Sequence, residues 1–92
     1  NDFPQSCIIK DKISTPNVNL ELLYESLIQT YSNIKHDIQD GVKLIWNDKW
    51  IHVRSSNTEP VIRIIAEASN LEIANLLIKN TKNKITSFLI EN

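Results

Sequence analysis

Residues 40–68 read DGVKLIWNDKWIHVRSSNTEPVIRIIAEA, and this stretch decides the fold. It contains three runs rich in β-branched and aromatic residues, which is typical of strands: residues 42–46, 50–55 and 61–68. The first two runs are separated by Asn47-Asp48-Lys49, whose polar side chains predict a tight hairpin turn. We therefore expect three consecutive strands in this part of the chain.

An amphipathic helix is predicted on each side of this strand block. Before it, apolar residues recur with helical spacing from Leu20 to Ile34. Asp40-Gly41, which contains the chain's one glycine, then predicts a turn into the strands, because glycine accepts positive φ. After the block, Ser69-Asn70-Leu71-Glu72 predicts a capping box with Ser69 as the N-cap. An apolar stripe typical of a second helix follows as far as Leu89.

The segment before the first helix predicts one more strand, over residues 6–13. Ser14-Thr15-Pro16-Asn17 follows it, with several candidate helix caps and a proline suited to a first turn. The element order is then β-α-β-β-β-α. The sequence predicts an α+β fold in two layers, with a largely antiparallel sheet of about four strands and both helices on one face.

Composition restricts the class of protein. The chain has 92 residues, which suits one small domain, and its formal net charge is −1. That charge argues against nucleic acid or an anionic membrane as a partner. The apolar runs are too short to cross a membrane, and no secretory leader is evident, so we expect a cytoplasmic protein. Because the chain contains no methionine, we expect it to be a piece of a longer protein, with residues 1–7 as a linker and residues 8–92 as the domain.

The polar segment between the second and third strands of the block carries the strongest functional signal. It reads Arg54-Ser55-Ser56-Asn57-Thr58-Glu59-Pro60, and Arg63 follows three residues later. Strand periodicity puts Arg54 and Arg63 on the same face, opposite an aliphatic row that should face the helices. A guanidinium fork matches two oxygens of a phosphate, while hydroxyls and backbone N–H groups of the turn can bind the third. The pattern predicts a site for a small, highly charged oxyanion.

Other readings of the same residues remain open. Charged sheet faces are common, so Arg54 and Arg63 are equally compatible with a solvated surface paired to Glu59 and Glu67. A four-stranded sheet with two helices also occurs in RNA-binding modules, where Trp50 would supply a stacking surface. A plain interaction domain without a small ligand is a third reading.

The same residues resemble the C-terminal domain of the α-D-phosphohexomutase superfamily, of the phosphoglucomutase/phosphomannomutase type. The resemblance covers about residues 8–88. It depends on residues 40–43, on residues 50–60 with the Arg-x-Ser-Asn-Thr-Glu-Pro motif, on Arg63, and on Glu67-Ala68. In phosphoglucosamine mutases, which are the alternative within this superfamily, glycine often stands at the position of Asn57.

The resemblance implies a TATA-binding-protein-like domain, the last of four around a cleft, that grips the substrate phosphate which is not transferred. The phosphate-binding residues it implies are Arg54, Ser56, Asn57, Thr58 and Arg63. It also implies a full-length enzyme that interconverts hexose 6-phosphate and hexose 1-phosphate by intramolecular phosphoryl transfer, with a phosphoserine and Mg²⁺. Neither the phosphoserine segment nor the metal loop is in this sequence, so we expect no catalytic residue, no cofactor and no activity in this chain alone. The expected partners are a hexose phosphate and the other domains of the same protein.

Overall fold

The computed structural model describes residues 6–15 and 18–91. Their strands form one five-stranded sheet in the order β1-β5-β4-β3-β2, and every neighbouring pair is antiparallel. The strands are β1 (Cys7–Ser14), β2 (Lys35–Asp37), β3 (Val42–Ile45), β4 (Lys49–Ser55) and β5 (Val61–Ala68). The predicted block of three strands is therefore confirmed as β3, β4 and β5, and β1 pairs with β5 at one edge.

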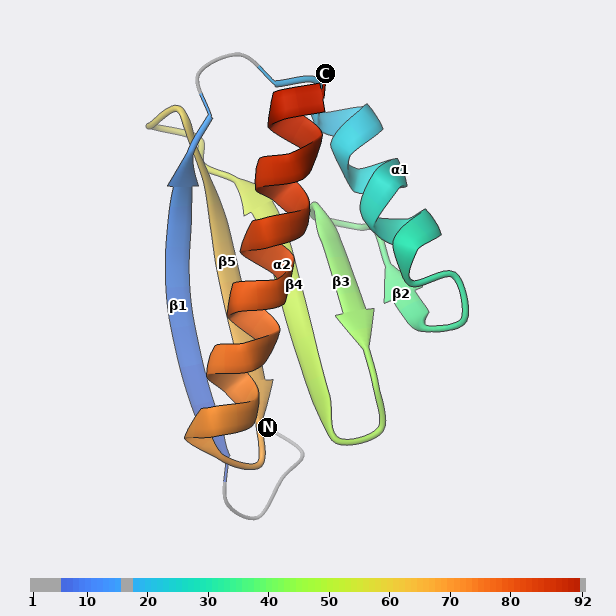
Figure 1. The fold of residues 1–92 in the computed structure, drawn as a ribbon, viewed down its shortest axis with the longest axis vertical. Coiled ribbons are helices and arrows are strands. Elements are labelled where there is room, and N and C mark those ends of the chain that lie inside the picture. Colours follow the sequence, from blue (N-terminus) through green and yellow to red (C-terminus); the bar gives the residue numbers. More distant parts are fainter. Residues whose placement is uncertain (1–5, 16–17, 92) are drawn as a thin grey trace.

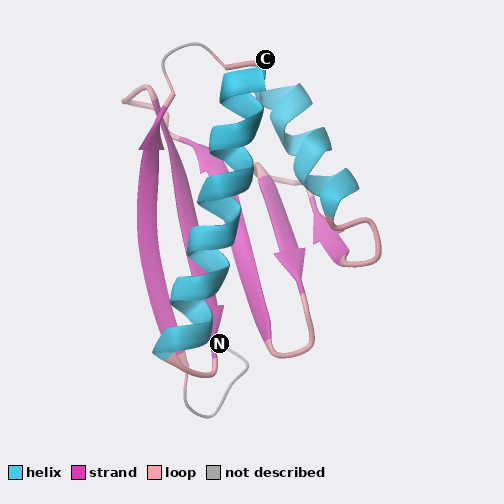
Figure 2. Ribbon diagram, in the orientation of Figure 1, coloured by secondary structure: helices cyan, strands magenta, loops and turns pink. Residues whose placement is uncertain are grey.

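The two helices lie on the same face of the sheet, which confirms the predicted two-layer α+β fold (Figure 1). They are α1 (Leu20–Thr30) and α2 (Leu71–Glu91). Helix α2 packs across β1 and β5, and α1 packs against β3. Figure 2 shows the helix layer in front of the strand layer, with α1 toward the edge formed by β2. One face of the sheet is thus covered, and the opposite face carries no helix of the described chain.

The strand count differs from the prediction of about four because the first helix is shorter than expected. Helix α1 ends at Thr30, and Lys35–Asp37 then pairs with β3 as the fifth strand. Tyr31 and Ile34 still pack against the core, but from a turn in which the Ile34 N–H donates to the Tyr31 carbonyl. The helical spacing of apolar residues therefore continues past the real helix end, and no glycine or proline marks the stop.

The helix caps also differ from the prediction. Asn70, not Ser69, caps α2, since its Oδ1 accepts a hydrogen bond of 2.8 Å from the Ile73 N–H. Asn19 caps α1 in the same way, through the Leu22 N–H. Serine and asparagine cap about equally well, so two adjacent capping residues leave the start ambiguous by one position. Of the predicted caps and linker, Pro16-Asn17 and residues 1–5 lie outside the described residues, and Cys7 of the predicted linker belongs to β1.

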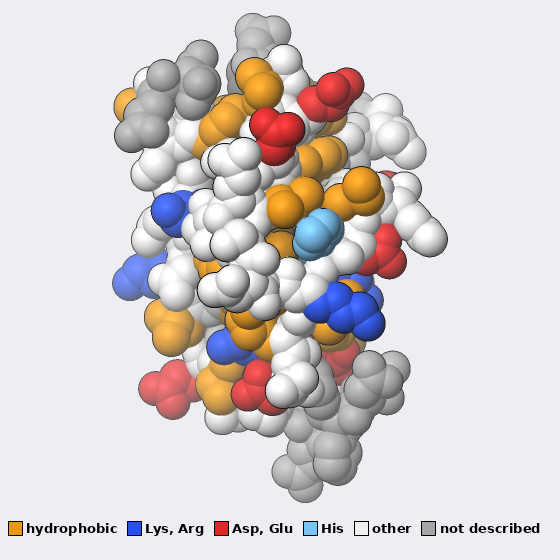
Figure 3. Space-filling model, turned by 90° about the vertical axis from the view of Figure 1, so that its right-hand side faces the viewer, with side chains coloured by type: hydrophobic (Ala, Val, Ile, Leu, Met, Phe, Trp, Pro, Cys, Tyr) orange, Lys and Arg blue, Asp and Glu red, His pale blue; other side chains and the backbone are white. Residues whose placement is uncertain are grey.

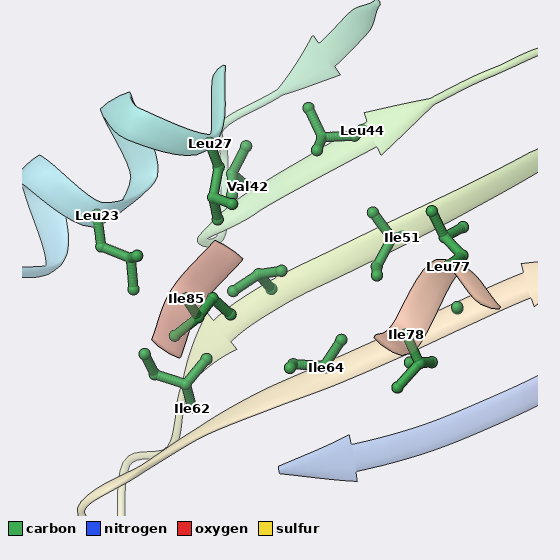
Figure 4. Close-up of a cluster of buried hydrophobic side chains, with 12 residues drawn as sticks. Leu23, Leu27, Val42, Leu44, Ile51, Ile62, Ile64, Leu77, Ile78 and Ile85 are labelled. Atoms are coloured by element: carbon green, nitrogen blue, oxygen red, sulfur yellow. The ribbon is translucent and has the colours of Figure 1, made fainter. Parts of the chain in front are cut away.

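The hydrophobic core lies between the sheet and the helices. Figure 4 shows aliphatic side chains from α1 and α2 meeting those of the middle strands. The strand residues of the core are 0% exposed, as alternation along β3, β4 and β5 predicts: Val42, Leu44, Ile51, Val53, Ile62 and Ile64. The helices contribute Leu23, Leu27, Leu77, Ile78 and Ile85. Burial of this one face fixes the register of the strands.

The opposite face of the sheet, which we call the open face, carries the alternate residues of the same strands. It presents Trp50, His52 and Arg54 from β4, Arg63, Ile65 and Glu67 from β5, and Lys10 and Lys12 from β1. The neighbouring edge, on the side of α1 and β2, mixes charges of both signs with hydrophobic side chains (Figure 3). Among the described residues, neither helix combines the length and the hydrophobicity that a membrane-spanning segment requires.

Candidate anion-binding site

The two arginines singled out by the sequence lie directly opposite each other. Arg54 near the end of β4 pairs with Arg63 near the start of β5, so both side chains project from the open face. Residues paired in this way have Cβ atoms about 4.5–5.5 Å apart, and like charges at that distance repel. Their placement on one face beside the connecting loop confirms the strand periodicity argument. Such a pair needs anions nearby to be stable.

Arg54 meets the first of these anions at the turn before β3. Its Nη1 lies 3.1 Å from Asp40 Oδ2, and its Nε is buried without a hydrogen-bond partner among the described residues. The close approach of the two segments requires Gly41, which has φ +70°. A Cβ on Gly41 would lie 2.2 Å from the Val53 carbonyl oxygen and 2.8 Å from Arg54 Cβ. The single glycine of the chain therefore lets Asp40 reach Arg54.

Arg63 meets a second carboxylate from the loop itself. Its Nη2 lies 3.5 Å from Glu59 Oε1, and both side chains are about half exposed. This pair agrees with the surface reading of the sequence, which named Glu59 as a partner. The other named carboxylate, Glu67, instead accepts a hydrogen bond of 2.8 Å from Trp50 Nε1. Because the Glu59 pair is long and solvated, it is worth little and is easily displaced by a stronger anion.

The loop between β4 and β5, residues 56–60, is shaped by Ser56. Its Oγ accepts from the N–H groups of Thr58 and Glu59, at 3.2 and 3.3 Å. A hydroxyl has two acceptor lone pairs and one donor proton, so the proton remains available. Thr58 Oγ1, 3.4 Å away, is one acceptor within its reach. Backbone N–H groups of this turn were predicted to bind the anion, but those of Thr58 and Glu59 donate to Ser56 within the loop.

Contacts from outside hold both ends of the loop. The N–H of Ser55 donates to the Tyr24 hydroxyl of α1 at 3.2 Å, and the N–H of Thr15 donates to the Pro60 carbonyl at 2.8 Å. Ser56 N–H donates to the Val61 carbonyl across the loop base. A pocket of about 210 Å³ lies beneath the loop, on the side of α1. The loop is therefore fastened at its base while Asn57 and Thr58 remain exposed at its tip.

The structure places some of the predicted site residues next to one another and others at the tip of the loop. Arg54 and Arg63 are neighbours by strand pairing, and Ser56 adjoins them at the loop base. Asn57 and Thr58 occupy the exposed tip, where their side chains are accessible to a ligand. Two positioning residues were missed, Asp40 and Tyr24. The hairpin register alone, which places Val42 opposite Val53, would have put Gly41 beside Arg54 and so revealed Asp40; no local signal pointed to Tyr24.

The remainder of the open face is organised around Glu67, which is 2% exposed. The pKa of its carboxyl is lowered from the ordinary value, mainly by a hydrogen bond from the Ser6 side chain and further by the one from Trp50. Lys43 Nζ lies 4.4 Å from the centre of the Trp50 ring. Trp50 is thus engaged on its edge and its face, which disfavours the base-stacking role considered for it. His52 Nε2 contacts the Asp40 carbonyl, so this ring supports the turn at Asp40.

The described residues contain no group of three or more His, Cys, Asp or Glu side chains suited to a metal ion. Asp40 pairs with Arg54, and Asp37 accepts a hydrogen bond from the Gln39 N–H. The two arginines and the hydroxyl groups of the loop are hydrogen-bond donors suited to an anion.

Comparison with known proteins adds the family context. A family model described as phosphoglucomutase/phosphomannomutase, C-terminal domain, matches residues 17–83. A phosphoglucosamine/phosphogalactosamine mutase of Sulfurisphaera tokodaii is 39% identical over 83 residues, covering 87% of this chain and 18% of that protein. A probable phosphoglucosamine mutase of Pyrococcus horikoshii is 33% identical over 90 residues, covering 95% of this chain and 18% of that protein. A phosphoglucomutase/phosphomannomutase of Thermococcus kodakarensis is 52% identical over 40 residues, 44% of this chain and 9% of that protein.

Proposed function

Because the chain belongs to the family of phosphoglucomutase/phosphomannomutase C-terminal domains, we propose that it binds the phosphate of a hexose phosphate. The observation that carries this proposal is the pairing of Arg54 with Arg63 beside a loop of hydroxyl and amide side chains. Two guanidinium groups a strand apart offer parallel donors to different oxygens of one phosphate. The family membership makes a sugar phosphate the favoured source of that anion.

Each proposed ligand residue has a donor free for the phosphate. Arg54 keeps its Nη2, since only its Nη1 contacts Asp40, and Arg63 exchanges its long contact with Glu59 for the ligand. Ser56 supplies its hydroxyl proton, because its lone pairs already accept from the loop. The side chains of Asn57 and Thr58 bind from the tip. Asp40 holds Arg54 in place throughout, whereas Glu59 holds Arg63 until the dianion replaces it.

In a longer protein this site would position substrate for a mutase. The reaction is the interconversion of hexose 6-phosphate and hexose 1-phosphate, a phosphoryl transfer between two oxygens of one sugar. Either end of the sugar must therefore be able to reach the reacting group. A clamp that recognises phosphate alone holds the non-reacting end in both orientations. Mg²⁺ would supply charge neutralisation at the transferred phosphoryl group, and its ligands and the phosphoserine would come from other domains. The isolated 92-residue chain is then a binding domain without turnover.

The sugar is the open point within this proposal. The Arg-x-Ser-Asn-Thr-Glu-Pro motif with Asn57 favours a glucose or mannose phosphate. The relatives from Sulfurisphaera tokodaii and Pyrococcus horikoshii, each of which matches most of the chain, favour an amino sugar, since both carry phosphoglucosamine mutase names. Phosphoglucosamine mutase is therefore the second candidate, and kinetics of the longer protein with glucose 1-phosphate and glucosamine 1-phosphate would separate the two. An RNA-binding role is disfavoured by the net charge of −1 and by the engaged Trp50.

A titration of the 92-residue chain tests the phosphate site directly. Amide NMR spectra would be recorded with glucose 6-phosphate, with inorganic phosphate and with glucose. We expect shifts at residues 54–63 with the two phosphates, none with glucose, and a Kd on the order of millimolar for so small a contact area. Arg63→Ala should weaken binding about tenfold or more, the loss of one charge-assisted contact. Equal shifts with glucose, or an unchanged Kd for Arg63→Ala, would contradict the proposal.

A further inference from the structure

We infer that Lys12 of β1 is a third phosphate-binding cation of this site. It gives the site the net positive charge that the two arginines, each paired with a carboxylate, do not provide. The inference deepens the proposed function and depends on it. It adds one residue, from a different strand, to the motif on β4, β5 and their loop. Nothing in the local sequence around Lys12 points to it, because it becomes a neighbour of the motif only through strand pairing.

The sheet places Lys12 in one row with both arginines. Lys12 pairs with Arg63 across β1 and β5, and Arg63 pairs with Arg54 across β5 and β4. Directly paired residues project from the same face, so three cationic side chains stand side by side on the open face. The hydrogen bond from Thr15 N–H to the Pro60 carbonyl keeps the end of β1 against the β4–β5 loop. Lys12 therefore flanks Arg63 on the side away from Arg54, within reach of the same ligand.

The charge balance of this row distinguishes Lys12 from the arginines. Arg54 is paired with Asp40, and Arg63 with Glu59, so each guanidinium has its own carboxylate. Lys12 takes part in no ion pair within residues 6–15 and 18–91. Its neighbour Asp11 faces the helices and pairs with Lys82 at 2.9 Å. The five charged groups of the row and its partners sum to one positive charge, and Lys12 provides it.

This net charge matters for a phosphate monoester, which carries between one and two negative charges near pH 7. Two arginines neutralised by two carboxylates offer good geometry but little net attraction. An added ammonium beside them attracts the dianion and helps it to displace Glu59 from Arg63. Lys12 also discourages the exposed edge strand β1 from pairing with another chain, a role that any charged residue there would fill. Lys10 shares that edge role but is opposite Ile65, one row farther from the arginines.

The matched variants Lys12→Ala and Lys10→Ala test the inference. Both remove one positive charge from the same face of the same strand. The 92-residue chain would be titrated with inorganic phosphate and with glucose 6-phosphate at low salt, with amide NMR giving both the Kd and a check of the fold. We expect Lys12→Ala to raise the Kd about threefold to fivefold, as loss of one partly screened charge contact predicts. Lys10→Ala should change it clearly less, and Lys12→Arg should restore it.

The outcomes separate this inference from the proposed function. Equal effects of Lys12→Ala and Lys10→Ala would overturn the inference, because only the overall field would matter. An unchanged Kd in Lys12→Ala, together with lost binding in Arg63→Ala, would overturn it while leaving the proposed phosphate site intact. If Arg63→Ala also binds normally, the proposed function itself fails. If Lys12→Ala disturbs the fold, Lys12→Gln, which keeps most of the side-chain stem, gives the same comparison.

Discussion

The two faces of β4 and β5 are made of alternate residues of the same two segments, yet they have opposite character. On the helix-covered face, Val53 and Ile64 are paired and 0% exposed. One residue further along β4 and one back along β5, Arg54 and Arg63 are paired on the open face and partly exposed. Burial of the first pair stabilises the folded state, whereas like-charge repulsion in the second pair destabilises it.

This contrast separates a buried aliphatic pair from a pair of like charges over a distance of one residue. The aliphatic pairs hold the strands in register, and that register places the arginines and Lys12 in a row. Around Arg54 and Arg63 the open face is partly exposed and contributes less to this burial, so it can hold like charges side by side. Changes on the helix-covered face should affect stability first, and changes on the open face should affect binding first.

The largest effect is expected from Ile64→Ala on the helix-covered face. Ile64 is fully buried, so its truncation should lower the free energy of unfolding by about 2–5 kcal/mol. Total stability of small domains is about 5–15 kcal/mol, so urea unfolding would show a large shift in midpoint. The control is Ile65→Ala, the next residue, on the open face. Equal losses in both variants would show that the two faces are not as different as their burial indicates.

Gly41→Ala should lower both the stability that depends on the helix-covered face and the phosphate binding proposed for the open face. The new Cβ would approach the Val53 carbonyl and Arg54 Cβ, at a backbone φ of +70° that disfavours alanine. We expect a loss of roughly 2 kcal/mol in unfolding free energy, together with weaker phosphate binding because β4 shifts at Arg54. Thermal unfolding and phosphate titration would measure the two effects. Asn47→Ala in the exposed β3–β4 turn is the control, and a variant Gly41→Ala with normal affinity and stability would refute the close approach.

Arg54→Lys should affect only the open face. Lysine keeps the charge but cannot contact Asp40 and the phosphate with a planar fork, so the Kd for phosphate should rise about tenfold. The free energy of unfolding should stay within about 0.5 kcal/mol of the parent value, as for most surface substitutions. The titration and a urea curve on the same sample would separate the effects. A lysine variant that binds as well as the parent would mean that Arg54 acts as a point charge only.

The smallest expected effect is on the pH dependence of stability. It comes from the ion pair between Asp11 of β1 and Lys82 of α2, at the edge of the helix-covered face. The pKa of Asp11 lies below its ordinary value of 3.8, mainly because Lys82 hydrogen-bonds to it and also because of the Lys12 N–H. A lowered pKa in the folded state adds stability above the unfolded pKa, and this is lost as pH falls through the folded value. Since both partners are 39% exposed, we expect less than about 1 kcal/mol. Lys82→Ala should reduce the fall in stability between about pH 5 and pH 3; an unchanged pH slope would exclude the pair as a contributor.

Much of the fold could be predicted because strand alternation is a local property. The three strands of residues 40–68, the helix positions and the shared face of Arg54 and Arg63 all follow from spacing. The errors fell at element ends, where Ile34 continues the helical pattern after α1 has ended and where Ser69 and Asn70 are both suitable caps. Local pattern does not decide such boundaries, because the residue that packs against the core is the same in either conformation.

The candidate site was predicted only in part, for a related reason. Its motif residues are close in sequence, and their types suit an oxyanion. Asp40, Tyr24 and Lys12 come from the turn before β3, from α1 and from β1, so their contribution depends on how separate elements meet. The assignment of Arg54, Ser56, Asn57, Thr58 and Arg63 as phosphate ligands stays a prediction until binding is measured.

By itself, the sequence determined four of the five strands and the positions of both helices, which face of each of those strands is apolar, and that two arginines flank one loop. Those properties depend on side-chain periods of two residues in strands and 3.6 residues in helices, which can be recognised within a few neighbouring positions of the chain. Only the tertiary structure decided that β1 lies beside β5, that Lys35–Asp37 closes the sheet, and that Asp40 reaches Arg54. These contacts join residues far apart in the chain. They are selected by burial of the shared core, which no single segment specifies alone.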